Sequence, residues 1–142
     1  MGKKHIVQVD QGELIKEKEA KVRPSAEKIL EGKIYVSSSY NNTLITLTNV
    51  RGQVLAWRSA GSVGFKGTKK ATSFAASKVA EAISNICKKI GVEKISVLIK
   101  GIGAGRESAV RTLVAQGLNI VSIKDVTPIP HNGCRPKKVR RV

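Results

Sequence analysis

The spacing of apolar residues between positions 33 and 126 constrains the fold more than any other feature of this chain. Over residues 33–58 apolar and β-branched side chains recur at every second position, which is the period of a strand with one buried face. Asn41-Asn42 and Arg51-Gly52 interrupt this pattern with residues that favour tight turns. We therefore expect three antiparallel strands joined by short hairpins, with positive φ angles at asparagine in the first turn.

The period changes to that of a helix after a glycine- and lysine-rich loop at residues 61–70. Apolar residues then recur at three- and four-residue intervals up to Ile90, with Thr72 suited to cap the helix and Gly91 suited to end it. Residues 95–99 are apolar apart from one serine, which predicts a strand buried on both faces.

A second helix and a last strand complete the pattern. Residues 106–116 have helical spacing, and the side chains expected on the core side are Ala109, Val110, Leu113 and Val114. Residues 118–126 are the last expected strand, because Pro128 and Pro130 stop regular structure soon afterwards. The order β-β-β-α-β-α-β predicts one α/β domain whose last three strands are parallel neighbours joined by right-handed crossovers.

Charge is distributed unevenly along the chain. Residues 1–32 carry seven Lys and Arg against six Asp and Glu, whereas residues 33–142 carry 19 against four. This excess in the folded part indicates a polyanionic partner, most simply a nucleic acid. A solvated surface without such a partner is one alternative, although such surfaces usually mix both signs. A generic DNA-compacting protein is another.

The composition divides the chain into three parts. We interpret residues 1–32 as an N-terminal extension with a short helix within residues 13–31, broken at Pro24. Residues 33–126 form the α/β domain. Residues 127–142 form an extended basic tail, whose cations are Arg135, Lys137, Lys138, Arg140 and Arg141. Proline keeps such a segment extended and suits it to lie between phosphate backbones. A solubilising tail or a localisation signal is the alternative.

The glycine-rich segment Gly101–Arg106 joins a strand to a helix N-terminus. Free N–H groups, the helix dipole and Arg106 would favour an anion there, such as one phosphate of a nucleic acid. A dinucleotide-binding enzyme is the rival interpretation, because Asp125 follows at the distance of a ribose ligand, but Arg106 stands where that motif needs its last glycine. The loop at residues 61–70 does not match a P-loop.

Other chemistry has little support in the sequence. His131 and Cys134 lack the further ligands that zinc needs, and Cys87 is interpreted as a core residue. The four acids of residues 33–142 form no evident catalytic pair, so we expect neither an enzyme nor a metal or cofactor. Two cysteines indicate a reducing compartment, and we expect no signal peptide and no membrane span.

Four segments resemble the universal small-subunit ribosomal protein eleven family in its bacterial form. They are residues 40–48, 57–67, 101–109 and 125–136, and the resemblance covers roughly residues 33–142. Two positions depart from the family pattern. Ile102 replaces the proline of a Gly-Pro-Gly loop, and Lys137 replaces the second proline of the tail.

The resemblance implies a ribonuclease-H-like α/β fold with a mixed five-stranded sheet that carries out no catalysis. It implies a cytoplasmic protein in the ribosome, on the platform of the small subunit. There the family bridges several rRNA helices and helps to form the cleft for the mRNA leader (the Shine-Dalgarno region). The implied protein neighbours are the seventh and eighteenth small-subunit proteins, with initiation factor three nearby.

The resemblance also carries RNA contact over to matching residues of this chain. These are Asn41, Asn42, Arg51, Lys66, Lys69, Lys70, Arg106, His131, Asn132, Arg135, Lys137 and Lys138. Arg140 and Arg141 are added because of their charge alone. With so few aromatic residues, we expect recognition to depend on RNA shape more than on base reading.

Overall fold

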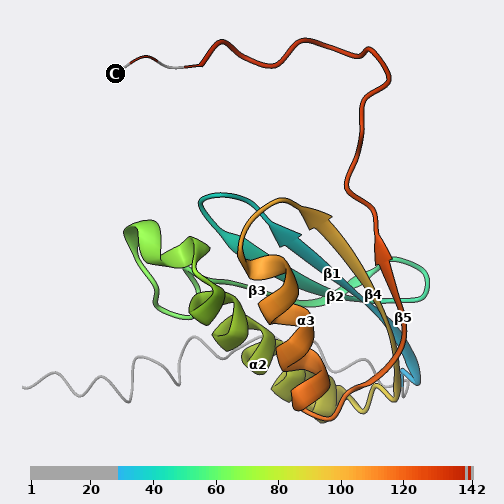
Figure 1. Cartoon of the computed structure of the whole chain (residues 1–142). Coiled ribbons are helices and arrows are strands. Elements are labelled where there is room, and N and C mark those ends of the chain that lie inside the picture. Colours follow the sequence, from blue (N-terminus) through green and yellow to red (C-terminus); the bar gives the residue numbers. More distant parts are fainter. Residues whose placement is uncertain (1–28, 140, 142) are drawn as a thin grey trace, which may run out of the picture.

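The described part of the chain forms one mixed sheet with the strand order β3-β2-β1-β4-β5 (Figure 1). The structure is a computed structural model that describes residues 29–139 and residue 141. Its strands are β1 (Glu31–Ser38), β2 (Thr43–Asn49), β3 (Val54–Ser59), β4 (Lys94–Gly101) and β5 (Asn119–Asp125). Its helices are the 3₁₀ helix η1 (Gly67–Ala71), α2 (Ser73–Ile90) and α3 (Gly105–Ala115). The predicted α/β class and five-stranded mixed sheet are confirmed, whereas the helix expected within residues 13–31 falls almost entirely outside the described residues.

The strand β1 lies at the centre of the sheet, and this corrects part of the predicted topology. β1 pairs antiparallel with β2 and parallel with β4, so that Val36 lies between Ile45 and Ile99. β3 and β4 are therefore not neighbours, so that part of the prediction for the last three strands was wrong, whereas β4 and β5 are parallel neighbours as predicted. The meander β1-β2-β3 leaves one edge of β1 free, and the 18 residues of α2, about 27 Å of helix, are long enough to carry the chain across to that edge.

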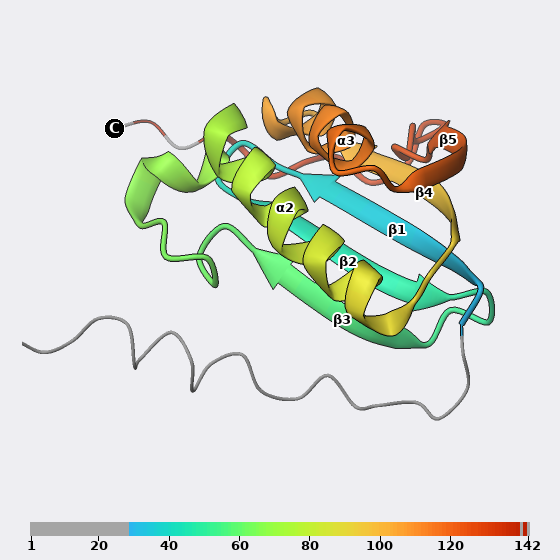
Figure 2. The same cartoon turned by 90° about the horizontal axis from the view of Figure 1, so that it is seen from below.

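Both helices cover the same face of the sheet (Figures 1 and 2). α2 contacts β2 and β3, α3 contacts β1 and β4, and the two helices contact each other. The connections β3-α2-β4 and β4-α3-β5 both move the chain in the same direction across the sheet. Because such crossovers have the same handedness, their helices lie on the same face of the sheet. The core between these two layers is aliphatic, and its fully buried side chains include Ile34, Ile45, Leu47, Ile83, Ile95 and Leu113.

The opposite face of the sheet carries no helix among the described residues, so the prediction that β4 is buried on both faces was wrong. Ile95 and Val97 are buried beneath the helices, whereas Ser96 and Leu98 on the other side are half-buried. An apolar run in the sequence does not show whether a second layer exists to cover it. We call this uncovered surface the open face, and its residues include Lys33, Tyr35, Thr46, Trp57, Ser96, Leu98, Lys100 and Lys124.

The ends of α2 are as predicted. The side chain of Thr72 accepts a hydrogen bond from the amide of Ala75, and Gly91 ends the helix with a φ of 82°. In α3, Ala109 and Leu113 are buried as expected. Val114 is exposed, contrary to the prediction, because α3 lies over β1 and β4 and leaves β5 uncovered at the edge of the sheet. Neither helix combines the length and the hydropathy that a membrane crossing requires.

The first hairpin turn differs from its predicted geometry. The amide of Ser39 donates to the carbonyl oxygen of Asn42 at 2.9 Å, and Asn42 Oδ1 accepts from the amide of Thr43 at 3.0 Å. Neither Asn41 nor Asn42 has a positive φ. The asparagine stabilises the turn through its side-chain acceptor, which needs no left-handed backbone. Gly52 has a φ of 87°, as expected of a tight second turn.

Candidate nucleic-acid interface

Four connections meet at the end of the sheet where β1, β3, β4 and β5 finish. They are the β1–β2 loop (residues 39–42), the segment before α2 (residues 60–72), the β4–α3 loop (residues 102–104) and the start of the tail (residues 126–127). We call these four segments together the carboxyl end. Figure 1 shows the tail leaving the sheet there. Ligands of open α/β sheets bind at the carboxyl ends of the parallel strands, so this is the first region in which to look for a site.

Gly101 and Gly103 bring the β4–α3 loop directly against the end of β1. A Cβ atom at Gly101 would collide with the carbonyl oxygen of Ser38, and one at Gly103 would collide with that of Ser39. The amide of Gly103 donates to Ser38 O at 3.0 Å, and the amide of Gly101 donates to Thr127 Oγ1 at 3.2 Å. These glycines therefore serve the packing of the chain, and two of the N–H groups expected to face an anion already have partners.

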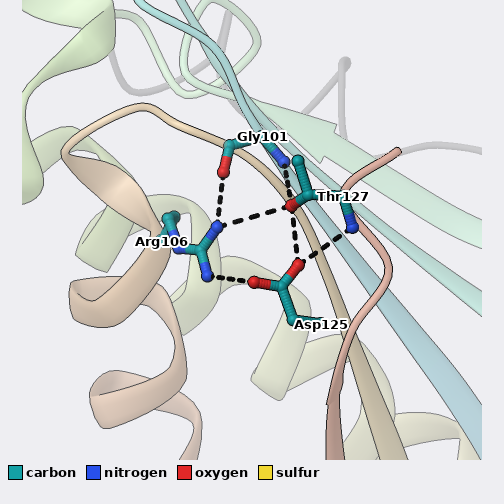
Figure 3. A network of polar contacts seen from close by, with 4 residues as sticks. All are labelled: Gly101, Arg106, Asp125 and Thr127. Carbon is teal, nitrogen blue, oxygen red and sulfur yellow. Dashed lines mark hydrogen bonds and ion pairs between the residues drawn. The ribbon is translucent and has the colours of Figure 1, made fainter. Parts of the chain in front are cut away.

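Arg106 lies at the centre of a polar network at the root of the tail (Figure 3). Its Nη1 donates to Gly101 O at 2.6 Å, and its Nη2 donates to Asp125 Oδ2 at 2.6 Å. Asp125 Oδ1 accepts from both the hydroxyl and the amide of Thr127, at 2.6 and 2.9 Å. The first turn of α3 is thus tied to the end of β5 and to the first residue of the tail. This network fixes the direction in which the tail leaves the sheet.

The same network explains the acidity of Asp125 and weakens the dinucleotide interpretation. Hydrogen bonds from the Thr127 hydroxyl, the Arg106 guanidinium and the Thr127 amide hold the pKa of Asp125 well below its usual value. A ribose ligand would need a free carboxylate oxygen. Both oxygens of Asp125 already accept hydrogen bonds from the chain itself.

We expect Asp125→Asn to lower the free energy of unfolding at neutral pH. The pKa of Asp125 is lower in the folded chain than in the unfolded chain, where it is about 3.9. The carboxylate therefore stabilises the fold above about pH 4, and this contribution is lost as the pH falls through the lower folded-state pKa. Urea unfolding from neutral to acidic pH should show a deficit in the variant that shrinks below about pH 4. A deficit of constant size at every pH would contradict this explanation.

The structure brings several of the predicted RNA contacts together at the carboxyl end. Asn41 and Asn42 lie in the β1–β2 loop, Lys66 precedes η1, and Lys69 and Lys70 lie in its last turn. Exposed tail residues continue from this end, and they are His131, Asn132, Arg135, Lys137, Lys138 and Arg141. Arg140 lies outside the described residues. Positive charge is therefore concentrated on the loops and the tail that start from the carboxyl end of the sheet.

Arg51 is the predicted contact that the structure does not bring to this group. It lies in the β2–β3 turn, close to the start of β1, where Lys33 Nζ donates to Val50 O at 3.3 Å. β1 has 8 residues, and a rise of about 3.3 Å per residue puts the two ends of the sheet about 25 Å apart. A ligand that touches both Arg51 and the carboxyl end must therefore span the sheet.

Thr127 is the residue of this region that the sequence analysis missed. Its place before Pro128 indicated only that regular structure ends there. The available signal was Asp125 two residues earlier, because an Asp side chain commonly accepts hydrogen bonds from the residue two positions on.

The two cysteines have opposite environments, and we expect them to differ in reactivity. Cys87 is buried in α2, and burial raises the pKa of its thiol to about 12, whereas Cys134 is exposed in the tail. No group of three or more metal-binding side chains occurs among the described residues. Native-state alkylation followed by peptide mass analysis should modify Cys134 alone. Rapid modification of Cys87 in the folded chain would contradict this environment.

Comparison with known proteins matches the sheet, the helices and the tail together. A family model described as "Ribosomal protein S11" matches residues 32–141. The "Small ribosomal subunit protein uS11" of Treponema pallidum (strain Nichols) is 48% identical over 122 residues, which cover 86% of this chain and 97% of that protein. The "Small ribosomal subunit protein uS11c" of Mesostigma viride is 52% identical over 122 residues, covering 85% and 93%. The "Small ribosomal subunit protein uS11" of Borreliella burgdorferi is 51% identical over 112 residues, covering 79% and 86%.

Proposed function

Because the chain belongs to the ribosomal protein S11 family, we propose that its carboxyl end and its tail bind small-subunit rRNA on the platform of the subunit. The family is structural and has no enzymatic activity. The chain is accordingly a small-subunit ribosomal protein that binds rRNA and acts in translation, and its place is in the ribosome in the cytoplasm.

The proposal for the carboxyl end rests on one observation, which is that the cationic loops and the basic tail start from the same end of the sheet. Lys66, Lys69 and Lys70 lie beside the end of the sheet from which the tail departs. The acidic side chains near this end are both ion-paired, Asp125 with Arg106 at 2.6 Å and Glu107 with Arg111 at 3.3 Å. The net field here is therefore positive, which favours phosphate, and affinity should fall steeply with salt.

The remaining predicted residues receive distinct roles in this proposal. The tail residues and the loop asparagines contact RNA directly. Arg106 positions the tail through Gly101 and Asp125, and its half-buried guanidinium is a secondary phosphate contact. Arg51 contacts a second RNA segment at the far end of the sheet. Binding at both ends supports a bridge between several rRNA helices, since phosphate chains that repel each other need a cation between them.

The finer placement follows the family resemblance. On the platform, the protein helps to form the cleft for the mRNA leader. Its neighbours are the seventh and eighteenth small-subunit proteins, and initiation factor three binds nearby. The carboxyl end and tail face the rRNA, which leaves the outer surfaces of α2 and α3 available to those proteins.

Sedimentation and footprinting test the proposal. A tagged chain expressed in a bacterium should migrate with small subunits in a sucrose gradient. Hydroxyl-radical footprinting of the purified chain on small-subunit rRNA should protect at least two segments that are separate in sequence, and Arg51→Ala should remove protection from one of them only. Absence from small subunits, or protection of duplex DNA in preference to rRNA at physiological salt, would overturn it.

A further inference from the structure

The five aromatic residues of the chain all lie outside its fully buried core. Trp57, Tyr40 and Phe74 have exposed fractions of 55%, 75% and 64%, and Tyr35 and Phe65 are half-buried. Phe65 packs against the core and contacts Phe74 edge to face, with ring centroids 5.9 Å apart. Aromatic side chains bury more apolar area than most others, so the remaining rings are available for contact with a partner. Two of them, Tyr35 and Trp57, are on the open face.

The register of the sheet aligns these two rings in one row across the open face. Tyr35 pairs with Thr46 of β2, and Thr46 pairs with Trp57 of β3. On the other side Tyr35 pairs with Leu98 of β4, which pairs with Lys124 of β5. The row therefore crosses all strands of the sheet, with one ring near its centre, one at the β3 edge and a lysine at the β5 edge.

Most of the charges on this face are positive. Lys33 and Lys100 alternate with the inward-facing residues of β1 and β4, and Lys124 pairs with Leu98, so all three lie on the open face, as does Lys94 at the start of β4. The acid on this side among the described residues is Glu31, which pairs with Lys94 at 3.8 Å.

On the helix side two cations have acidic partners, whereas Lys88 and Lys89 of α2 have none among the described residues. Glu81 pairs with Lys78 at 2.9 Å, and Glu107 pairs with Arg111. The face that presents the rings therefore carries three lysines, Lys33, Lys100 and Lys124, that have no ion-pair partner among the described residues.

We propose that the open face binds a single-stranded stretch of rRNA, with unpaired bases stacked on Trp57 and Tyr35 and phosphates beside Lys100 and Lys124. The proposal rests on the rRNA-binding function and adds a second surface to it, distinct from the carboxyl end and the tail. A sheet that presents aromatic rings among cations matches the way proteins bind unstacked bases. A duplex hides its bases and offers the rings nothing to stack on. An apolar protein surface would leave the lysines buried without partners, which is costly.

The sole tryptophan makes the proposal directly measurable, because all tryptophan emission of this chain comes from the open face. The full-length chain is titrated with an unstructured 12-nucleotide RNA and, separately, with a 12-base-pair RNA duplex. The single strand should quench the emission of Trp57 and the duplex should not. Quenching of equal size by both RNAs, or by neither, would overturn the proposal.

Substitutions separate stacking from charge. Trp57→Thr keeps a good strand former at an exposed edge position and should weaken binding of the single strand about tenfold, as read by fluorescence anisotropy of a labelled RNA. Lys100→Ala/Lys124→Ala should lower the slope of log K against log salt by about 1.4. The matched control Lys88→Ala/Lys89→Ala removes two exposed lysines near the far end of α2 and should leave Trp57 quenching unchanged.

The same variants distinguish failure of this inference from failure of the proposed function. If Trp57→Thr and Lys100→Ala/Lys124→Ala bind the single strand like the unmodified chain while the protein still enters small subunits, the open face is not an RNA surface and the function stands. If the unmodified chain neither enters small subunits nor binds their rRNA, the proposed function fails together with this inference.

Discussion

Gly101→Ala is expected to destabilise the fold by about 3 kcal/mol and to lower the melting temperature by about 10 °C. Two effects add at this position. Gly101 has a φ of 101°, a conformation that costs an L-residue about 1–2 kcal/mol, and its Cβ atom would collide with the carbonyl oxygen of Ser38. Because that oxygen belongs to the backbone of the central strand, relief requires a shift of β1 or of the whole β4–α3 loop. Thermal and urea unfolding measure the loss.

Gly91→Ala is the matched control for this prediction. Gly91 has a φ of 82°, but nothing lies within 4 Å of a Cβ atom built there, so the variant should lose only about 1–2 kcal/mol. The difference between the two variants isolates the close approach of β4 to β1. Equal losses would show that this approach does not constrain the fold.

Lys137→Ala/Lys138→Ala is expected to weaken binding to small-subunit rRNA by roughly 60-fold at about 0.1 M salt, if each lysine neutralises one phosphate. Both side chains are exposed in the tail and have no ion-pair partner among the described residues. Each phosphate contact contributes about 0.9 to the slope of log K against log salt, so the slope should fall by up to about two. Filter binding at several salt concentrations gives both quantities.

The control for the tail variant again uses two lysines of α2. Lys88→Ala/Lys89→Ala removes the same charge from the opposite end of the molecule, so a general effect of net charge would weaken binding equally in both variants. We expect the slope to change only for the tail variant. An unchanged slope for Lys137→Ala/Lys138→Ala would show that the tail does not contact phosphates.

The strands and helices of this chain could be predicted from sequence, because each depends on the spacing of apolar residues and on capping residues close by in the chain. Alternation identified β1 and β2, and Thr72 and Gly91 marked the ends of α2 within one residue. The pairing of β4 with β1 could not be predicted in this way. It depends on which edge of the meander remains free after the hairpins form, and periodicity carries no information about strand order.

The sequence could predict most of the residues that belong to the candidate site, but not how the fold arranges them in space. Composition indicated a polyanion, and the predicted loop contacts at Asn41, Asn42, Lys66, Lys69 and Lys70 lie at one end of the sheet. The sequence did not show that Arg51 lies apart from these residues. β2 runs antiparallel to β1, so the β2–β3 turn that contains Arg51 lies at the opposite end of the sheet. The sequence also did not show that Arg106 is held by Asp125, a contact between residues 19 positions apart.

Directed cleavage from the tail is the most direct test of the central claim that this chain holds small-subunit rRNA through its tail. Cys134 is exposed and Cys87 is buried, so an iron–EDTA reagent attaches to the tail of the unmodified sequence. In reconstituted small subunits, hydroxyl radicals from Cys134 should cut the rRNA of the platform at a few discrete places, and a Cys134→Ser chain treated in the same way should give no cuts. Discrete cuts confined to rRNA outside the platform, or no cuts above the Cys134→Ser background, would contradict the account.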